Sequence, residues 1–432
     1  MTSASAVDAR GRSASLIRNI AATFAVRGVN LFATVAIVHL AAAKLGTHGY
    51  GSLALLLSAS VLFSLLDFGL GLNLVNRISG ATSQVASRAV SRTWIVLCGF
   101  AVVFAVLGLA TLLVLPRLGI QSLDDQTLAA WRLAVLIFAL AIPASIAQRI
   151  LYARQRVAEA GAWFSAGQLC ALWGAFLVPV GPGMLQGFIL AVIGLPTLVA
   201  WINVAVIFVH RFPDLRPHLK EARWDELRPD LGHGVSFTTL QLAAYAEIAV
   251  DNLLIASFAT VAQVAHYDVM ARGFGYIVTL VALCAFPLWP ALRAGMSGGH
   301  TEWGRRVLMA AYGLTIVICL VGGGALAALH GPLFTLWTTH AYAPSPVMAM
   351  GFALFTLATA LCTVQAMDLN ARGEIAVQAR FQLIALPLLL AAKVLALLAG
   401  RIELLPYCAF AACAARFAVF AAHGRGRELA HG

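Results

Sequence analysis

The sequence has few charged residues. Only 11% of its 432 residues are Asp, Glu, Lys or Arg, whereas soluble domains average about 25%. A chain with so little charge cannot cover a water-facing surface, and 61% of its residues are hydrophobic. Because a spanning helix needs about 20 apolar residues, the composition excludes a soluble protein and predicts an all-α integral membrane protein.

The sequence also lacks the patterns of common enzyme, metal and nucleic-acid sites. Its seven cysteines are scattered without a C-x-x-C pair, which is typical of small hydrophobic side chains. No nucleophile-and-base spacing or phosphate loop occurs between the apolar runs. The formal charge of +11 is spread along the chain rather than gathered on one face. We expect no cofactor, metal, enzymatic activity or nucleic-acid partner, although a membrane glycosyltransferase or polymerase stays open.

Apolar runs of spanning length are numerous. They must be helices, because an open strand edge in hydrocarbon would leave backbone groups unpaired. The first run is too long for a signal peptide and is expected to be a retained span. Twelve transmembrane helices are predicted, near residues 20–43, 50–75, 94–116, 128–148, 162–181, 184–209, 233–258, 264–289, 307–330, 346–366, 379–399 and 404–422.

Basic residues orient these spans. Counted from a cytoplasmic N-terminus, 21 of the 29 Lys and Arg residues fall on the cytoplasmic side, four fall outside and four lie within the runs. This bias predicts that both termini are cytoplasmic. A bacterial inner-membrane location is expected.

A polar segment at 210–233 divides the chain into two predicted six-helix lobes, 1–215 and 216–432. Sliding the second half by 217 positions places Tyr50 on Tyr267 and Asn30 on Glu247. Six plus six spans with both N-termini inside would be a parallel repeat, which is a common plan for transporters.

Two stretches carry a family resemblance. From Leu45 the sequence reads LGTHGYGSLALLLSASVLFSLLDFGLGLNLVNRIS, with a Gly-Tyr-Gly motif that predicts a turn at 49–51. A second stretch contains Asp251-Asn252 and then VAHYDV at 264–269. Both resemble the lipid-linked oligosaccharide flippases and polysaccharide exporters of the multidrug/oligosaccharidyl-lipid/polysaccharide (MOP) superfamily.

The resemblance implies two six-helix lobes around a central cavity that opens alternately to each side. It implies a flippase that carries an undecaprenyl-diphosphate-linked oligosaccharide outward for O-antigen, exopolysaccharide or capsule synthesis, with polysaccharide polymerase machinery as a partner. A cation-coupled multidrug or metabolite antiporter of the same superfamily is the main alternative. A third hypothesis is a non-transporting scaffold. The ionisable residues inside the apolar runs argue against it, because a scaffold would not require them.

Two polar residues in the first run point to a binding face. Arg27 and Asn30 share one helix face with Thr34, which cannot be the lipid face because a charge at the bilayer centre costs about 2.5 to 3.5 kcal/mol. Arg27 either contacts a diphosphate, to whose oxygens a guanidinium donates paired hydrogen bonds, or pairs with Asp67 of the next run.

Two acids in the seventh run suggest coupling to an ion. Glu247 and Asp251 are spaced i, i+4, which stacks like charges unless a proton or Na+ relieves them. The other interpretation is that Asp251 pairs with Arg272 while Glu247 is neutral. Asp268 and Arg272 also have the order that favours an intrahelical pair.

Together these residues give the predicted site. In the resembled family, cationic residues of spans one and eight are thought to line the cavity, which adds Arg272 to Arg27. Lys393 either joins them or extends its long stem to the membrane interface. The predicted substrate-binding set is Arg27, Asn30, Asp67, Arg272 and Lys393, and the predicted ion-coupling pair is Glu247 and Asp251.

Overall fold

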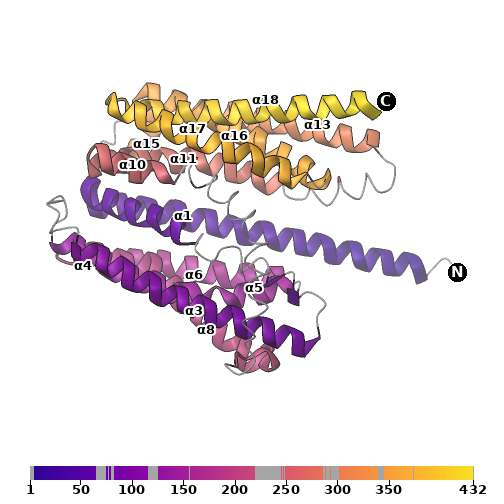
Figure 1. Cartoon of the computed structure of the whole chain (residues 1–432), viewed down its shortest axis with the longest axis horizontal. Helices are drawn as coiled ribbons and strands as arrows, with labels where there is room; N and C mark the ends of the chain where they lie inside the picture. Colours follow the sequence, from indigo (N-terminus) through magenta and orange to yellow (C-terminus); the bar gives the residue numbers. More distant parts are fainter. Residues whose placement is uncertain are drawn as a thin grey trace. The chain divides into compact units, whose positions relative to one another are not determined.

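The structure is a computed structural model of the whole chain (Figure 1). It describes residues 4–64, 74–75, 77–78, 82–114, 125–154, 156–218, 245, 247, 249–285, 288, 292, 301–338, 345–372 and 374–431. All regular structure in these ranges is helical, without a strand. The prediction of an all-α protein is confirmed.

Nine helical stretches within the described ranges are long and apolar enough to cross a membrane, so the chain is a multi-pass membrane protein. Three predicted spans lack a counterpart among the nine. The run 50–75 follows the first helix across a kink, and 233–258 lies mostly outside the described residues. The run 162–181 has the length, but Gln168 and three glycines lower its hydropathy. The nine stretches are Val26–Ala59, Ser83–Leu113, Asp125–Ala153, Met184–Arg211, Val261–Ala285, Glu302–Ala328, Pro346–Arg372, Arg380–Leu398 and Ile402–Ala422.

The chain folds into two compact units. Unit 1 comprises Met1–Leu45 and Phe63–Phe237, and unit 2 comprises Gly46–Leu62 and Thr238–Gly432. The sequence-based division at residue 215 follows chain order alone. The structure instead groups the short segment from Gly46 with the C-terminal helices, because its side chains bond to them.

The passage from unit 1 to unit 2 occurs at a kink in α1 (Ala4–Ser64). Gly46 there has φ 67° and ψ −174°, and every residue around it is helical. The positive φ favours glycine, which has no Cβ to clash in this region. The turn predicted at 49–51 is therefore wrong: Gly49, Tyr50 and Gly51 are helical, and the break lies before them at Gly46.

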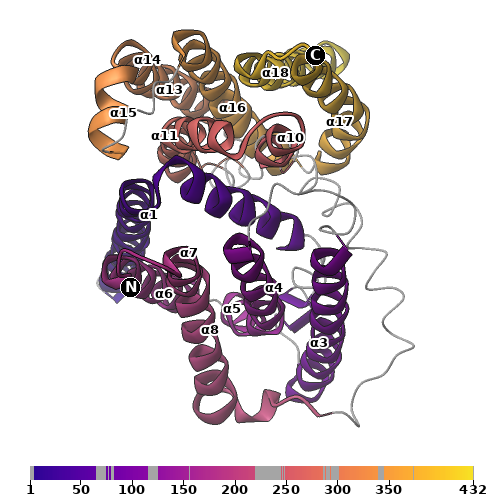
Figure 2. The ribbon, with the colours of Figure 1, turned by 90° about the vertical axis from the view of Figure 1, so that its left-hand side faces the viewer.

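Unit 1 is built from helices that run side by side (Figures 1 and 2). α3 packs on α4, and α6 packs on α8. Edge-to-face contacts of Trp94 with Trp201 and Phe208, each with ring centroids 5.7 Å apart, help to close the core. Its helices are α3 (Ser83–Val114), α4 (Asp125–Ala144), α5 (Ile146–Ala153), α6 (Val157–Leu177), α7 (Met184–Ile189) and α8 (Leu195–Val206), with π-helical turns at Leu190–Gly194 and Ile207–Arg211.

A lysine caps one helix of this unit. The Lys44 ammonium donates hydrogen bonds to the carbonyls of Phe176 and Val178, both at 2.8 Å, at the end of α6. A cation satisfies the carbonyls that a helix C-terminus leaves unpaired. α6 ends at Leu177, four residues before the predicted end of the fifth span at 181, and Pro179 follows the capped Val178.

Unit 2 contains the part of α1 that follows the kink, Gly46–Leu62, and the C-terminal helices. α16 packs on both α18 and α11, and Phe274 stacks between Phe334 and Phe352. Figure 2 shows α16, α17 and α18 beside α10 and α11. The helices are α10 (Val250–Phe258), α11 (Val261–Ala285), α13 (Thr301–Ile318), α14 (Gly324–Ala328), α15 (His330–Thr338), α16 (Pro346–Arg372), α17 (Ile375–Leu398) and α18 (Leu405–His431), with a π-helical turn at Cys319–Gly323.

The Gly-Tyr-Gly motif holds α1 against α11 within unit 2. A Cβ atom at Gly51 would lie 2.1 Å from the Val261 carbonyl oxygen, so only glycine permits this approach. The neighbouring Tyr50 donates a hydrogen bond from its hydroxyl to Asp268 at 2.6 Å. The motif therefore serves a helix–helix contact.

We expect Gly51→Ala to destabilise the protein by about 1 to 3 kcal/mol, because the new methyl group meets backbone that cannot rotate away. Gly275→Ala is the matched control, since a Cβ there meets nothing within 4 Å in the same unit. Thermal unfolding of the purified protein in detergent measures both. Equal unfolding temperatures for the two variants would contradict the close approach at Gly51.

Candidate functional site

A completely buried ion pair lies at the centre of the candidate site in unit 2. Lys393 of α17 donates a hydrogen bond from Nζ to Asp251 Oδ1 of α10 at 2.6 Å. The side chains are 0% and 1% exposed. Lys393 also donates to the backbone carbonyl of Glu247 at 3.0 Å. The other Asp251 carboxylate oxygen accepts a short hydrogen bond from the Tyr267 hydroxyl. Both charges are thus held by specific partners, as burial requires.

A second ion pair lies beside the first. Arg416 of α18 contacts Glu247 Oε1 through its Nη1 at 2.5 Å, and the side chains are 15% and 10% exposed. Gln382 of α17 donates to the same carboxylate oxygen at 3.3 Å. Cys413 is a weaker neighbour, with its Sγ 3.8 Å from Oε2.

Asp268 of α11 is the hub of a third cluster. Its Oδ2 accepts hydrogen bonds from the Tyr50 hydroxyl at 2.6 Å and from Arg272 Nε at 2.5 Å. Its Oδ1 accepts from Asn252 Nδ2 at 2.8 Å, and that amide also donates to Ser58 at 2.8 Å. One carboxylate therefore ties together α1, α10 and α11. Asn252 follows Asp251 in the chain, so the cluster adjoins the buried ion pair.

The like charges of Glu247 and Asp251 are compensated in a way that the sequence did not predict. Glu247 and Asp251 do face the same region, but each has its own cation from another helix, Arg416 and Lys393. The alternative in which Asp251 pairs with Arg272 is wrong, because Arg272 pairs with Asp268 in the predicted intrahelical order. Glu247 also has a cationic partner, because the Arg416 guanidinium lies against its carboxylate.

The interpretation that Lys393 reaches the membrane interface is also wrong. Its ammonium is completely buried and bonded within unit 2. The reason is energetic: α10 supplies the Asp251 carboxylate within hydrogen-bond distance, and burying either charge without the other would be strongly unfavourable. Arg416 was not among the residues predicted for the site. The available signal was an arginine inside the last apolar run, which needs a counterion in the membrane.

Two of the three predicted residues of unit 1 lie on α1. Arg27 and Asn30 are half-buried, whereas Phe32 on another face is 67% exposed. Asn30 Oδ1 is buried and has no hydrogen-bond partner among the described residues. α1 packs there on α6, where the Ser165 hydroxyl donates to the Val26 carbonyl at 3.3 Å. Asp67 lies outside the described residues, as does any pair that it makes with Arg27.

The charges of the site balance in unit 2. Glu247, Asp251 and Asp268 are matched one to one by Arg416, Lys393 and Arg272. Among the described residues, no group of three or more His, Cys, Asp or Glu side chains is placed to hold a metal ion. Any ion or charged solute that enters this network must therefore compete with a partner already present.

Similar structures place this arrangement in a known fold. An inward-facing multidrug resistance MATE family transporter of the MOP superfamily is similar with a TM-score of 0.78 at 12% identity, over 93% of this chain and 96% of that one. The chain has the MATE transporter fold. A mutant of the Vibrio cholerae MATE transporter VcmN is similar with a TM-score of 0.62 at 14% identity, over 96% and 98% of the two chains.

A third similar structure shows how far the MATE fold extends. It is a MOP superfamily transporter from Pyrococcus furiosus, with a TM-score of 0.61 at 12% identity over 94% of both chains. For that protein, the reversed polarity of its binding pocket suggests a different function. No family model and no curated protein matches the present sequence. At 12 to 14% identity, the similarity to these structures shows the fold.

Proposed function

We propose that this protein is a secondary transporter that exchanges an organic solute for a cation across the membrane. The observation that carries the proposal is the buried Lys393–Asp251 pair within a chain of MATE fold. Ionisable groups inside membrane segments are costly and mark transport pathways or coupling sites. The structural neighbours, which include a multidrug resistance MATE family transporter, support an antiporter better than they support a flippase.

The ion pairs supply a means of coupling. A proton that binds Asp251 would leave the Lys393 ammonium without its counterion in a buried place, so protonation must be accompanied by rearrangement of α10 and α17. Na+ has less access, because the Asp251 carboxylate and the Glu247 carbonyl already hold the ammonium. We therefore propose H+ as the coupling ion, with Na+ as the alternative.

The test starts from deletion of the gene in its own host. We expect the deletion strain to become sensitive to toxic organic compounds, and expression of the chain to restore resistance. Everted membrane vesicles then show solute uptake driven by a pH gradient. Normal resistance together with an accumulation of undecaprenyl-linked oligosaccharide on the inner leaflet would instead identify a flippase.

The flippase is the second candidate because of a polar face in unit 1 and two elements of the sequence. Arg27 and Asn30 form a half-buried polar face on α1, and a guanidinium suits a diphosphate. The LDFGLG and Asn-Arg elements of the sequence point the same way, although LDFGLG lies outside the described residues. A lipid-linked oligosaccharide would then be the cargo, and polymerase machinery a partner.

We expect Arg27→Ala to abolish transport while the protein stays inserted and abundant, because the cation on this face is lost without a large change in packing. Vesicle transport and immunoblotting measure the two effects. Arg27→Lys distinguishes the two candidate functions. If the cargo is anionic, as it is for the flippase, this variant keeps part of its transport, because lysine retains the positive charge. Arg132→Ala, on α4, is the control. Full transport by Arg27→Ala would contradict the assignment of this face.

A further inference from the structure

Four arginines gather at one end of unit 1, on the side that the sequence predicts to be cytoplasmic. Arg154 and Arg156 lie between α5 and α6, whereas Arg211 ends the π-helical turn after α8 and Arg216 follows it. The two segments meet, because the Arg154 guanidinium lies over the Phe212 ring, 5.7 Å from its centroid. We call these four side chains the basic cluster.

Among the described residues, Glu159 of α6 is the only acid that pairs with the basic cluster. Its Oε2 lies 2.6 Å from Arg156 Nε and its Oε1 lies 3.7 Å from Arg211 Nε, and these arginine side chains are 37% and 49% exposed. Arg216 Nε donates instead to a backbone carbonyl of the π-helical turn at 2.6 Å. A guanidinium has five N–H donors, of which Nε supplies one. The cluster therefore has a surplus of positive charge and of donors.

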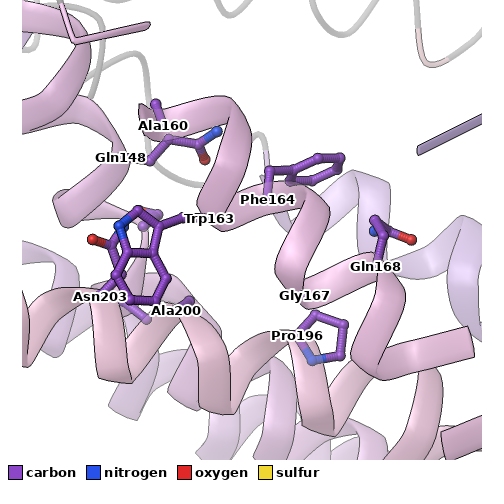
Figure 3. Close-up of a pocket in the computed structure, with 11 residues that line it drawn as sticks. Gln148, Ala160, Trp163, Phe164, Gly167, Gln168, Pro196, Ala200 and Asn203 are labelled. Carbon is purple, nitrogen blue, oxygen red and sulfur yellow. The ribbon is translucent and has the colours of Figure 1, made fainter. Parts of the chain in front are cut away.

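A cavity of about 80 Å³ lies deeper in the same helices (Figure 3). Trp163 and Phe164 line it from α6, and they lie about 10 to 12 Å from Arg156 along the helix. Phe164 is 50% exposed, so the cavity borders the surface of the unit. It narrows at the far end, where a Cβ on Gly167 would lie 3.3 Å from Pro196 Cα. None of the residues that line it is charged. A basic end and an uncharged, partly aromatic hollow thus share one face of α6.

We propose that this end of unit 1 binds an anionic phospholipid, with the phosphate at Arg156 and Arg211 and the start of an acyl chain in the cavity. Guanidinium groups donate paired hydrogen bonds to phosphate oxygens. The apolar lining with Trp163 suits a hydrocarbon chain. Free phosphate would leave the cavity unused, and an uncharged lipid would leave the arginines unused.

The depth of the two parts fits a lipid of the bilayer. Arg156 and Arg211 lie at helix ends, which is the level of the headgroups, and indole rings are typical of the membrane interface. Basic pockets between membrane helices on the cytoplasmic side bind anionic headgroups. The lipid is a resident partner and not the transported solute, so the inference does not rest on the proposed exchange.

Binding of dioleoyl phosphatidylglycerol to the purified full-length protein tests this site, by titration in an uncharged detergent followed by native mass spectrometry. We expect tighter binding than that of dioleoyl phosphatidylcholine. The double variant Arg156→Gln, Arg211→Gln is expected to weaken it at least about tenfold, equivalent to about 1.4 kcal/mol. Arg401→Gln is the control, because it makes the same charge change at an exposed arginine of unit 2.

Two further variants test the two parts of the site. Glu159→Gln removes the carboxylate that competes with phosphate for both arginines, so binding is expected to tighten by roughly threefold to tenfold. A merely structural role of Glu159 would not tighten it. Ala200→Leu fills the cavity from α8 and is expected to weaken binding of phosphatidylglycerol by about tenfold, equivalent to about 1.4 kcal/mol.

Thermal unfolding without added lipid separates lost binding from lost folding. Exposed ion pairs contribute little to stability, so the arginine variants are expected to unfold near the wild-type temperature, and Arg211→Gln alone is the milder substitute. The proposal is overturned if phosphatidylglycerol binds no more tightly than phosphatidylcholine, or if the double variant binds it as Arg401→Gln does. Unchanged binding by Glu159→Gln or Ala200→Leu also overturns it, as does displacement of the lipid by equimolar inorganic phosphate or farnesyl diphosphate.

Discussion

Replacing Lys393 by methionine is expected to abolish transport and to destabilise unit 2. The substitution keeps most of the side-chain volume but removes the cation, which leaves Asp251 as a buried charge that is 1% exposed. Breaking a buried pair in this way costs about 3 to 5 kcal/mol. Thermal unfolding in detergent measures the stability, and uptake into vesicles measures transport of the solute that the deletion strain identifies.

A double variant separates the two effects of Lys393. With Asp251→Asn added to Lys393→Met, neither charge remains, so the unfolding temperature is expected to recover most of the loss. Transport stays absent if the pair couples ion movement to solute movement. Arg401→Met, which breaks the exposed Arg401–Glu403 pair, is expected to change stability by at most about 1 kcal/mol. Wild-type, pH-driven transport by the double variant would show that the pair is structural only.

Asp268→Ala is expected to have the second large effect. It leaves Tyr50, Asn252 and Arg272 without the carboxylate that joins them, and this carboxylate is 6% exposed. The loss of a buried acceptor from a guanidinium and two neutral donors is expected to cost about 3 to 5 kcal/mol. Thermal unfolding of the purified variant measures the effect.

The chain contains a matched control for this substitution. Asp368 and Arg372 of α16 form an ion pair with the same i, i+4 spacing, but the arginine side chain is 39% exposed. Asp368→Ala is expected to cost only about 0.2 to 0.5 kcal/mol, as measured for exposed helical pairs. Similar losses for the two variants would refute the role of Asp268 as the hub of three helices.

The sequence supported one correct local prediction at the site. The order Asp268 then Arg272 at i, i+4 is a property of one helix, and the pair forms as predicted. Such predictions succeed because the helix itself fixes which side chains are neighbours.

The partners across helices could not be predicted in the same way. Glu247 and Asp251 find their cations 169 and 142 positions away, in Arg416 and Lys393. Spacing along one helix says nothing of these contacts, and hydropathy places Lys393 near the end of a run, where an interfacial position is plausible. Only the packing of α10 against α17, and the contact of Arg416 on α18 with Glu247, show which opposite charges are within reach.

Composition and hydropathy were enough to predict the class of this protein, its helical content and the positions of most spans, because a membrane imposes length and hydropathy on each span separately. The folded chain was needed to show which half the segment after Gly46 packs with, which acid meets which base, and where unit 1 leaves a cavity. These features depend on contacts between side chains far apart in the chain, and a buried charge selects its partner by distance in space.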